Sequence, residues 1–523
     1  MARPRDTRPS TPDRRALLAA ERGPGCIGGG PIRVALVYPN SYHIGMSSLG
    51  FQLTMQAIGN WGARAERFFI DTFTQGSIET GAAASDFDVV AFSATYELDA
   101  PHVLDALEWS GLPLESRRRG PGWPLVVMGG LLASVNRLPL YPFIDVFAHG
   151  DAERLVPGLL DLVARERAGE LGRRDVLEAL GEQPGLEVTA GAREAAGLEV
   201  PAELTPLVDL LDRDGEAQLP RPPAPRLAFL DPLDGSPCAS SIITPHTEFA
   251  EMGLIDLARG CPHHCTFCWL GHHSPAYRVR PAEEVVAAAG RLMAHTDRLG
   301  LVASAVGAHP RIDLICEELM KRGAKISFSS LRVEDVTPAM LRALHASGQK
   351  SATIAPEAGS VRVRRLLGKP ISDDQVLAVA EEIFGLGIES LKMYFMIGVP
   401  TETDDEALEI AAFVEKVRAV QLKWARPRGR MGSLGINLGL FVPKPGLPLL
   451  KLEPVPLARK KKRLARVARA LERIPNTRVA ASSPELARSQ EILSMGGAEA
   501  ARYVMAARQS NLDWRAANRE YRH

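Results

Sequence analysis

Residues 252–268, MGLIDLARGCPHHCTFC, join a short apolar segment to a loop that carries three cysteines. The apolar run Met252–Leu257 has the length and composition of a buried strand. Cys261, Cys265 and Cys268 are three of only six cysteines in 523 residues, which is too few for a disulfide framework. A cluster of cysteines directly after a strand therefore predicts a metal site.

This segment opens a series of alternating strands and helices. Further strands are predicted at 301–306, 326–331, 352–355, 390–396 and 436–442, and amphipathic helices at 281–296, 310–322, 338–347, 372–386 and 403–419. Six such repeats over about 200 residues predict a TIM-like, partial (β/α)6 barrel, in which the loops after the strands carry the chemistry. The cysteines would then lie on the first functional loop of the barrel.

A second alternating series precedes the barrel. Strands are predicted at 32–39, 88–93, 124–130 and 144–148, separated by helices at 47–59, 101–110 and 151–165. Short apolar strands that alternate with helices indicate parallel βαβ units and a doubly wound parallel sheet, so the fold class is α/β. In such sheets, ligands bind beyond the carboxyl ends of the strands.

These patterns divide the chain into five regions. We expect a disordered tail, a Rossmann-type domain, a linker or covering segment, the barrel and a helical C-terminal region, over residues 1–31, 32–165, 166–235, 236–454 and 455–523 respectively.

Composition and charge exclude several classes of protein. The chain has 62 Lys and Arg against 62 Asp and Glu, so no global charge attracts nucleic acid or an anionic membrane. No apolar run approaches the roughly 18 residues of a membrane-spanning helix, and the N-terminus lacks the apolar core of a secretory signal. The sequence therefore predicts a cytoplasmic globular protein with no membrane partner.

The spacing of the cysteines favours an iron–sulfur cluster. Three thiolates separated by four and three positions can wrap one face of a compact group of irons, and three ligands for four irons leave one iron open for chemistry. One alternative is a closed zinc site completed by a nearby histidine, namely His263, His264, His272 or His273. Zinc modules usually pair two short motifs, and no second pair is evident. Another alternative is a chance group of buried thiols.

The pattern Cys-x3-Cys-x2-Cys after a strand, with Phe267 before the last cysteine, resembles the radical S-adenosylmethionine (SAM) superfamily. The resemblance implies a 4Fe–4S cluster on the three cysteines and SAM bound to the open iron. It also implies an electron donor such as a flavodoxin or ferredoxin. Reductive cleavage of SAM would then yield a 5′-deoxyadenosyl radical.

Three later segments extend the resemblance and indicate SAM contacts. The run Ala355–Ser360 is similar to a segment that contacts the ribose or methionine part of SAM, the run Ser330–Arg332 is a further contact, and the run Ile397–Thr403 resembles a loop that lies against adenine. Together with the cysteine loop, the implied SAM-binding residues are Phe267, Ser330, Arg332, Glu357, Ser360, Arg364, Lys369, Gly398 and Pro400. A simpler explanation is that Glu357 stabilises a helix N-terminus and that Gly398 and Pro400 only shape a turn.

The first domain resembles the cobalamin-binding domain that precedes many radical SAM barrels. The resemblance is carried by Gly129-Gly130 and by residues 139–153, and it implies cobalamin contacts at Ser93, Gly129 and Gly130. The Asp-x-His-x-x-Gly motif that supplies an axial histidine is absent, and His43 is the nearest candidate. Cobalamin would be bound without a protein axial ligand, or the domain has kept the fold and lost the ligand.

The leading hypothesis is a radical SAM enzyme, with cobalamin-dependent methylation of an unactivated carbon as its specific form. An enzyme that modifies RNA without cobalamin is one alternative, motivated by basic runs at 426–430 and 459–473. The absence of interleaved aromatics favours a solvated helix face for these runs. An electron carrier or redox sensor without catalysis is the other alternative. The substrate and any further catalytic residue are not indicated.

Overall fold

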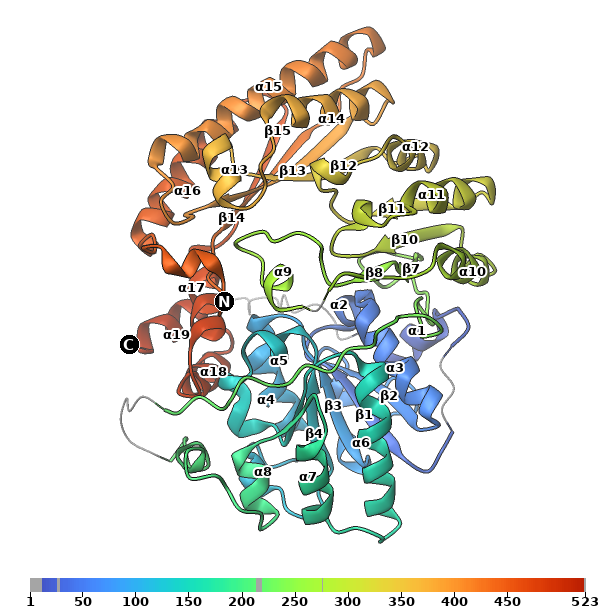
Figure 1. Ribbon diagram of the computed structural model, residues 1–523, viewed down its shortest axis with the longest axis vertical. Helices are drawn as coiled ribbons and strands as arrows, with labels where there is room; N and C mark the ends of the chain where they lie inside the picture. Colours follow the sequence, from blue (N-terminus) through green and yellow to red (C-terminus); the bar gives the residue numbers. More distant parts are fainter. Residues whose placement is uncertain (1–11, 26–28, 213–218, 275, 522–523) are drawn as a thin grey trace, which may run out of the picture. The chain divides into compact units, whose positions relative to one another are not determined.

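The structure is a computed structural model of the chain, and it describes residues 12–25, 29–212, 219–274 and 276–521 (Figure 1). The chain divides into two compact units. The first contains Met1–Ala228, Ser241–Glu251 and Gly497–Gln509, and the second contains Phe229–Ser240, Met252–Gly496 and Ser510–His523. Neither unit is therefore continuous in sequence.

The first unit is built on a six-stranded sheet in the order β2-β1-β3-β4-β5-β6. Its strands are β1 Arg33–Tyr38, β2 Arg64–Phe69, β3 Val89–Ser93, β4 Leu125–Gly129, β5 Val146–Ala148 and β6 Leu186–Val188. All pairings are parallel except that between β5 and β6. Because β1 lies inside the sheet, the chain winds in both directions from it, as predicted. The direction reverses between β1 and β3, which makes their carboxyl ends the expected ligand site.

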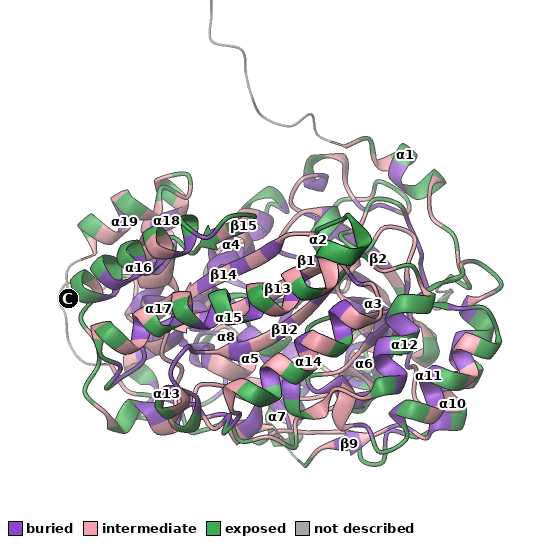
Figure 2. Cartoon of the chain, turned by 90° about the horizontal axis from the view of Figure 1, so that it is seen from above, coloured by how far each residue is buried: buried purple, intermediate pink, exposed green. Residues whose placement is uncertain are grey.

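The helices of the first unit bury their apolar sides. They are α1 Arg14–Ala19, α2 Tyr42–Ser47, α3 Leu49–Trp61, α4 Ala100–Trp109, α5 Leu131–Asn136, α6 Ala152–Arg167, α7 Arg173–Glu182, α8 Ala190–Ala195 and α18 Ala500–Gln509. Ser48 caps α3 by accepting a hydrogen bond from the Phe51 N–H. In Figure 2 the helices are buried on one side and exposed on the other, which is the signature of an apolar stripe facing a core.

Several regions of the first unit differ from the sequence interpretation. The tail expected to be disordered contains α1, because Asp13 caps it and Leu17 is buried, while residues 1–11 and 26–28 lie outside the described part of the chain. Residues 173–195, placed in the linker or covering segment, form α7, β6 and α8, and residues 213–218 are not described. Strand β2 escaped the sequence analysis because its charged residues break the apolar pattern of a buried strand.

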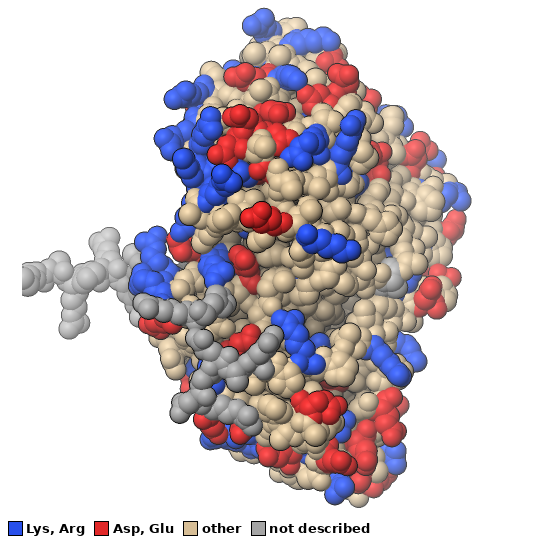
Figure 3. Space-filling view, turned by 60° about the vertical axis from the view of Figure 1, so that its left-hand side comes forward, with Lys and Arg blue, Asp and Glu red and all other residues tan. Residues whose placement is uncertain are grey.

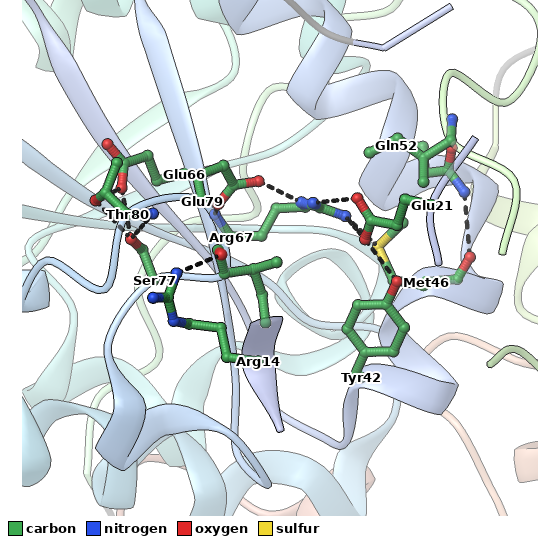
Figure 4. Close-up of polar contacts among 12 residues, drawn as sticks. Arg14, Glu21, Tyr42, Met46, Gln52, Glu66, Arg67, Ser77, Glu79 and Thr80 are labelled. Carbon is green, nitrogen blue, oxygen red and sulfur yellow. Dashed lines mark hydrogen bonds and ion pairs between the residues drawn. The ribbon is translucent and has the colours of Figure 1, made fainter. Parts of the chain in front are cut away.

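The charged residues of β2 are held by buried partners. Figure 4 shows the Arg67 side chain between two carboxylates: Nε donates to Glu79 Oε1 at 2.6 Å, and the two terminal nitrogens donate to Glu21 at 2.8 Å. Tyr42 Oη donates to the same Glu21 carboxylate at 2.5 Å. Arg67 is only 1% exposed, so this network joins the segment after α1 to the sheet and to α2.

In the described residues of the second unit, seven strands run parallel to one another. They are β7 Gly253–Asp256, β10 Arg298–Val302, β11 Lys325–Phe328, β12 Ser351–Glu357, β13 Ser390–Ile397, β14 Leu434–Leu440 and β15 Thr477–Ala481. They form one sheet in the order β11-β10-β7 and another in the order β12-β13-β14-β15, and a parallel bridge between Leu331 and Ile354 joins the two. A short antiparallel pair, β8 Ala258–Arg259 and β9 Arg278–Val279, flanks the cysteines. The structure confirms the predicted fold, a partial barrel of parallel strands.

One strand of the barrel was not predicted. We expected six strands and a helical region from residue 455, but β15 comes from that region and pairs in parallel with β14. The rest of the region is helical, as predicted. Thr477–Ala481 is mostly exposed and lacks the apolar run of a buried strand, so only its pairing identifies it.

The helices of the second unit follow the strands. They are α9 Leu270–His273, α10 Ala282–Leu292, α11 Ile312–Lys321, α12 Pro338–Ala346, α13 Val361–Leu366, α14 Asp373–Gly385, α15 Asp404–Arg428, α16 Leu457–Glu472, α17 Pro484–Met495 and α19 Trp514–Glu520. Capping boxes begin α14 at Ser372 and α15 at Thr403. Over the described residues of both units, no helix combines the length and apolarity needed to cross a bilayer.

Candidate functional site

The three cysteines lie in the loop between β8 and α9, residues 260–269, which we call the cysteine loop (Figure 1). Gly260 adopts φ +81°, a left-handed conformation that favours glycine, and turns the chain into this loop. Cys265 is buried, whereas Cys261 and Cys268 are half-buried. Burial raises the pKa of the Cys261 thiol above its ordinary value. The Cys268 N–H donates to Cys265 O at 3.0 Å, so the backbone turns tightly between the last two cysteines.

The cysteine loop is anchored to the segment that follows α13. Thr266 donates through its N–H to Leu367 O at 3.1 Å and through Oγ1 to Leu366 O at 2.7 Å. Gly368 approaches the loop so closely that a Cβ on it would lie 3.0 Å from His264 O. These contacts bring two segments about 100 residues apart in sequence into one site, since Thr266 and Leu366 are separated by 100 positions.

Arg332 contacts the cysteines directly. One of its terminal nitrogens donates to Cys265 Sγ at 2.9 Å, and the other contacts Glu334 at 2.9 Å and Gly368 O at 3.5 Å. Its Nε is buried and has no hydrogen-bond partner among the described residues. The sequence placed Arg332 against SAM; the structure places part of its guanidinium on a thiol. Ser330, from the same predicted contact, is exposed.

The end of β12 carries an ion pair beside the cysteine loop. Glu357 Oε1 accepts a hydrogen bond from Lys369 Nζ at 2.7 Å, and Lys369 also donates to Ala355 O at 3.0 Å. Glu357 adopts φ +68°, an uncommon conformation for a residue with a side chain. Ser360 caps α13 and donates to Glu406 at 3.3 Å. Glu357 and Lys369, both predicted as SAM contacts, thus lie together as an ion pair.

Arg364 is committed to the protein itself. Its side chain is fully buried, with Nε 2.7 Å from Ala358 O, one terminal nitrogen 3.0 Å from Gly359 O and the other 2.8 Å from Asp373. Its guanidinium also lies 4.5 Å from the centre of the Phe413 ring. These contacts brace the loop between β12 and α13, which is a different use from the SAM contact that the resemblance implied.

A hydrogen bond between two of its own residues stabilises the loop after β13. Gly398 adopts φ +83°, and its N–H donates to Glu402 Oε2 at 2.8 Å. Pro400 is buried. The backbone N–H of Gly398 is therefore occupied, and contact with a ligand would have to come from other atoms of this loop.

An apolar cluster joins the cysteine loop to the later loops of the barrel. Phe267 packs against residues from the loops after β12, β13 and β14: Ala358, Val363, Leu367, Val399, Phe441 and Leu449. Apolar walls of this kind exclude water from a site and strengthen the electrostatic interactions within it.

The four histidines near the cysteines contact the protein. His263 bonds Asp335 at 2.7 Å, His264 bonds Gly271 O at 2.8 Å, His272 bonds Cys265 O at 3.0 Å and His273 stacks on Trp269 with ring centres 4.9 Å apart. Among the described residues, no three His, Cys, Asp or Glu side chains converge as ligands of a single ion.

The first unit offers a separate candidate site at the carboxyl edge of its sheet. Ser93 and Gly129 end the neighbouring strands β3 and β4 and lie in register. Gly130 adopts φ +95°, and a Cβ there would lie 2.3 Å from Ala94 O, so only glycine fits. The same edge exposes Ile44, Tyr96 and Leu131, which follow β1, β3 and β4, and also exposes His43.

Comparison with known families matches both units. A model described as Radical SAM proteins, N-terminal, matches residues 61–188, and one described as Radical SAM superfamily matches residues 255–414. The second match contains the cysteine loop and the loops after β10 to β13. The chain belongs to the radical SAM superfamily. Membership makes it an enzyme and implies a 4Fe–4S cluster and SAM as cofactors.

Relatives of this radical SAM protein span most of its length. A protein of Methanocaldococcus jannaschii, itself uncharacterized, is 25% identical over 435 residues, 82% of this chain and 81% of that one. The ribosomal protein uS12 methylthiotransferase RimO of Solibacter usitatus is 25% identical over 317 residues, 56% of this chain and 65% of RimO. The solved structure of the radical SAM methyltransferase TsrM from Kitasatospora setae, with cobalamin and a 4Fe–4S cluster bound, is 16% identical with a TM-score of 0.52, covering 80% of this chain and 73% of TsrM. This last likeness shows the fold.

The residues of the second unit fit the cofactors that the family implies. Arg332 Nε is a buried donor without a partner among the described residues, as expected beside an absent acceptor. The three thiols need not converge on one point, because each thiolate of a 4Fe–4S site binds a different iron. Cys261, Cys265 and Cys268 would hold the cluster, with Arg332 beside Cys265.

Sequence reasoning missed several residues that shape these sites. The apolar edge of Ile44, Tyr96 and Leu131 gave no signal, because each residue follows a different strand. Lys460 and Arg463 lie in a basic run that we interpreted as a solvated face, yet both side chains are buried. Both lie on the same face of the amphipathic helix as Leu464 and Val467. The helical periodicity of the sequence could therefore have identified them as buried.

Proposed function

We propose that this radical SAM enzyme binds a 4Fe–4S cluster through Cys261, Cys265 and Cys268, cleaves SAM reductively and carries out cobalamin-dependent methylation of an unactivated carbon. The observation that carries the proposal is the combination of two sites in one chain. A cysteine loop is packed against the loops of a partial barrel, and a doubly wound sheet exposes an apolar carboxyl edge.

The chain's own residues would hold and shield the reacting groups. When bound, the cluster supplies the electron that cleaves a carbon–sulfur bond of SAM. Arg332 donates to Cys265 Sγ and so stabilises negative charge on that ligand. Glu357 and Lys369 offer opposite charges suited to the amino and carboxylate groups of an amino acid. Phe267 and its apolar cluster exclude water from the place where a radical would form.

The first unit would bind the corrinoid, which supplies a methyl carrier when bound. Gly130 lets the start of the loop after β4 pack closely on Ala94, and Ile44, Tyr96 and Leu131 offer apolar and aromatic surface to a flat macrocycle. The fold shared with TsrM, whose structure contains cobalamin, supports this part of the proposal.

Detection of 5′-deoxyadenosine tests the radical part. Reconstituted protein, reduced anaerobically with SAM, should release 5′-deoxyadenosine, and the Cys268→Ala variant should release none above background. Cys316→Ala is the matched control, because Cys316 is a buried thiol on α11, away from the cysteine loop. If the wild-type protein released no 5′-deoxyadenosine, the electron-carrier alternative would become the better one.

Corrinoid binding tests the methyl-transfer part. Wild-type protein should retain hydroxocobalamin through gel filtration, and Tyr96→Asp or Leu131→Asp should weaken retention at least about tenfold. Trp123→Asp is the control, since Trp123 is an exposed aromatic just before β4, at the opposite edge of the sheet. A wild-type protein that binds no corrinoid would refute the methyl-transfer part and leave the radical part standing.

The RNA-modifying alternative receives little support from the charges. On the face that Figure 3 shows, groups of Lys and Arg lie next to groups of Asp and Glu. Two cations of the basic run on α16 are buried and paired within the protein. RNA that copurified with a steep dependence on salt would favour this alternative.

A further inference from the structure

Two buried cations distinguish α16 from an ordinary solvated helix. Lys460 and Arg463 are 6% and 3% exposed, while Arg459, Lys461, Lys462 and Arg466 are exposed. Burying a cation is unfavourable unless the protein pairs it. The partners of these two side chains therefore show what the helix holds in place.

Arg463 is paired with the loop after β13. It donates to Glu402 Oε2 at 2.8 Å and to Asp404 Oδ1 at 2.8–2.9 Å. Glu402 Oε2 also accepts the Gly398 N–H at 2.8 Å, so one carboxylate oxygen joins the helix to the loop. The side chains of Arg463 and Glu402 are 2% and 1% exposed, and this pair is shielded from solvent.

The side chain of Lys460 packs directly on Gly398. A Cβ on Gly398 would lie 2.6 Å from Lys460 Cγ, so the aliphatic stem of the lysine lies directly on the glycine. Lys460 Nζ donates to Phe441 O at 2.8 Å and lies 5.6 Å from the centre of the Phe441 ring. The helix thereby fixes the loops after β13 and β14 together.

The loop under α16 needs such support. Gly398 and Thr401 adopt φ +83° and +63°, and a non-glycine residue at positive φ persists only when its surroundings enforce it. Val399, between them, packs in the apolar cluster that receives Phe267 and Phe441. This apolar cluster therefore joins the loop after β13 to the cysteine loop.

We infer that Lys460 and Arg463 are positioning residues that hold the loop Gly398–Glu402 in the conformation that binds SAM. Both lie beyond residues 255–414, the range of the radical SAM family match, so a helix outside the family region completes the site. The inference rests on the proposed function, because it assigns this loop to SAM.

Equilibrium SAM binding to the reconstituted full-length protein tests the inference. Arg463→Met and Lys460→Met should each raise the Kd for SAM about tenfold or more, with iron and sulfide content unchanged. Arg463→Lys should recover part of the affinity, since it retains the charge. Arg466→Met is the matched control, because it removes an exposed arginine from the same helix and should leave the Kd unchanged.

Glu402→Gln provides a second test, because glutamine has nearly the same size as glutamate and leaves no cavity in the loop. It keeps an oxygen acceptor for the Gly398 N–H but removes the charge that pairs with Arg463, so its effect on the Kd should not add to that of Arg463→Met. Equal Kd values for Arg463→Met, Arg466→Met and wild type would overturn the inference while leaving the proposed function intact. A wild-type protein that binds cluster but no SAM would overturn both.

Discussion

Arg332 illustrates how one side chain can set the properties of a metal site. Its guanidinium donates a hydrogen bond to Cys265 Sγ at 2.9 Å. Arg332 lies in the loop after β11, 67 positions after Cys265 in the sequence. Hydrogen bonds and positive charge at a sulfur ligand favour the reduced, more negative form of an iron–sulfur cluster. Arg332 should therefore raise the reduction potential.

Arg332→Met should make the midpoint potential of the reconstituted cluster about 30–100 mV more negative, since a one-electron couple shifts 59 mV per tenfold change in equilibrium. A redox titration followed by electron paramagnetic resonance measures this. Arg365→Met is the control, because Arg365 is exposed on the neighbouring α13 and carries the same charge. Equal shifts in the two variants would show that the contact with the thiol has no specific effect.

Asp99 in the first unit should make stability depend on pH. Burial raises the pKa of Asp99 to about 6, although a hydrogen bond from Asn40 Nδ2 at 2.8 Å and the nearby His102 oppose the rise. The folded state keeps this proton up to about pH 6, whereas the unfolded chain releases it near pH 3.8. The contribution of Asp99 to stability is therefore full below pH 3.8 and is lost as pH rises through 6.

Asp99→Asn should remove this loss, because the amide retains the oxygen that accepts from Asn40. Relative to wild type, its free energy of unfolding should improve by up to about 3 kcal/mol between pH 4 and pH 7. Urea unfolding at a series of pH values measures the difference. A constant difference over that range would contradict the assignment.

At the scale of elements, the buried network around Arg67 holds α2 and the segment after α1 on the sheet (Figure 4). Arg67→Met would leave Glu21 and Glu79 without their partner, and breaking a buried ion pair in this way costs about 3–5 kcal/mol. Denaturant unfolding measures the loss. Arg165→Met is the control, since its ion pair with Glu170 is exposed and should contribute less than about 1 kcal/mol. A loss below that of the control would show that the network is dispensable.

At the scale of the whole molecule, the first unit depends on a helix from the far end of the chain. In α18, Tyr503 and Val504 are fully buried, and Arg508 Nε bonds Asp105 of α4 at 2.7 Å. A chain that ends at Gly496 should therefore show faster hydrogen exchange in α4 and in Leu138–Phe143, which α18 contacts. A chain that ends at Ser510 retains α18 and should exchange like the full-length protein. Equal exchange in both chains would show that α18 contributes no stability to the unit.

Most of the architecture could be predicted because short runs of apolar residues indicate its strands and helices. The apolar runs that became β1, β3, β4 and β13 needed only their own residues to be identified. Strand β15 could not be found in this way, because it is largely exposed and is defined by its pairing with β14. The site followed the same rule: the cysteines are close in sequence, whereas the contact between Arg332 and Cys265 depends on two separate loops.

The amino-acid sequence by itself determined the α/β class, the cysteine loop after the first barrel strand and the family that this loop identifies. Spacing and periodicity act over a few residues, so they can be read without knowing the fold. The tertiary structure alone decided that Arg364 braces a loop, that Arg463 reaches Gly398 through Glu402, and that α18 completes the first unit. These contacts join residues that are distant in sequence. A buried charge or apolar face needs a partner that is close in space, and only the packing of the chain decides which residue that is.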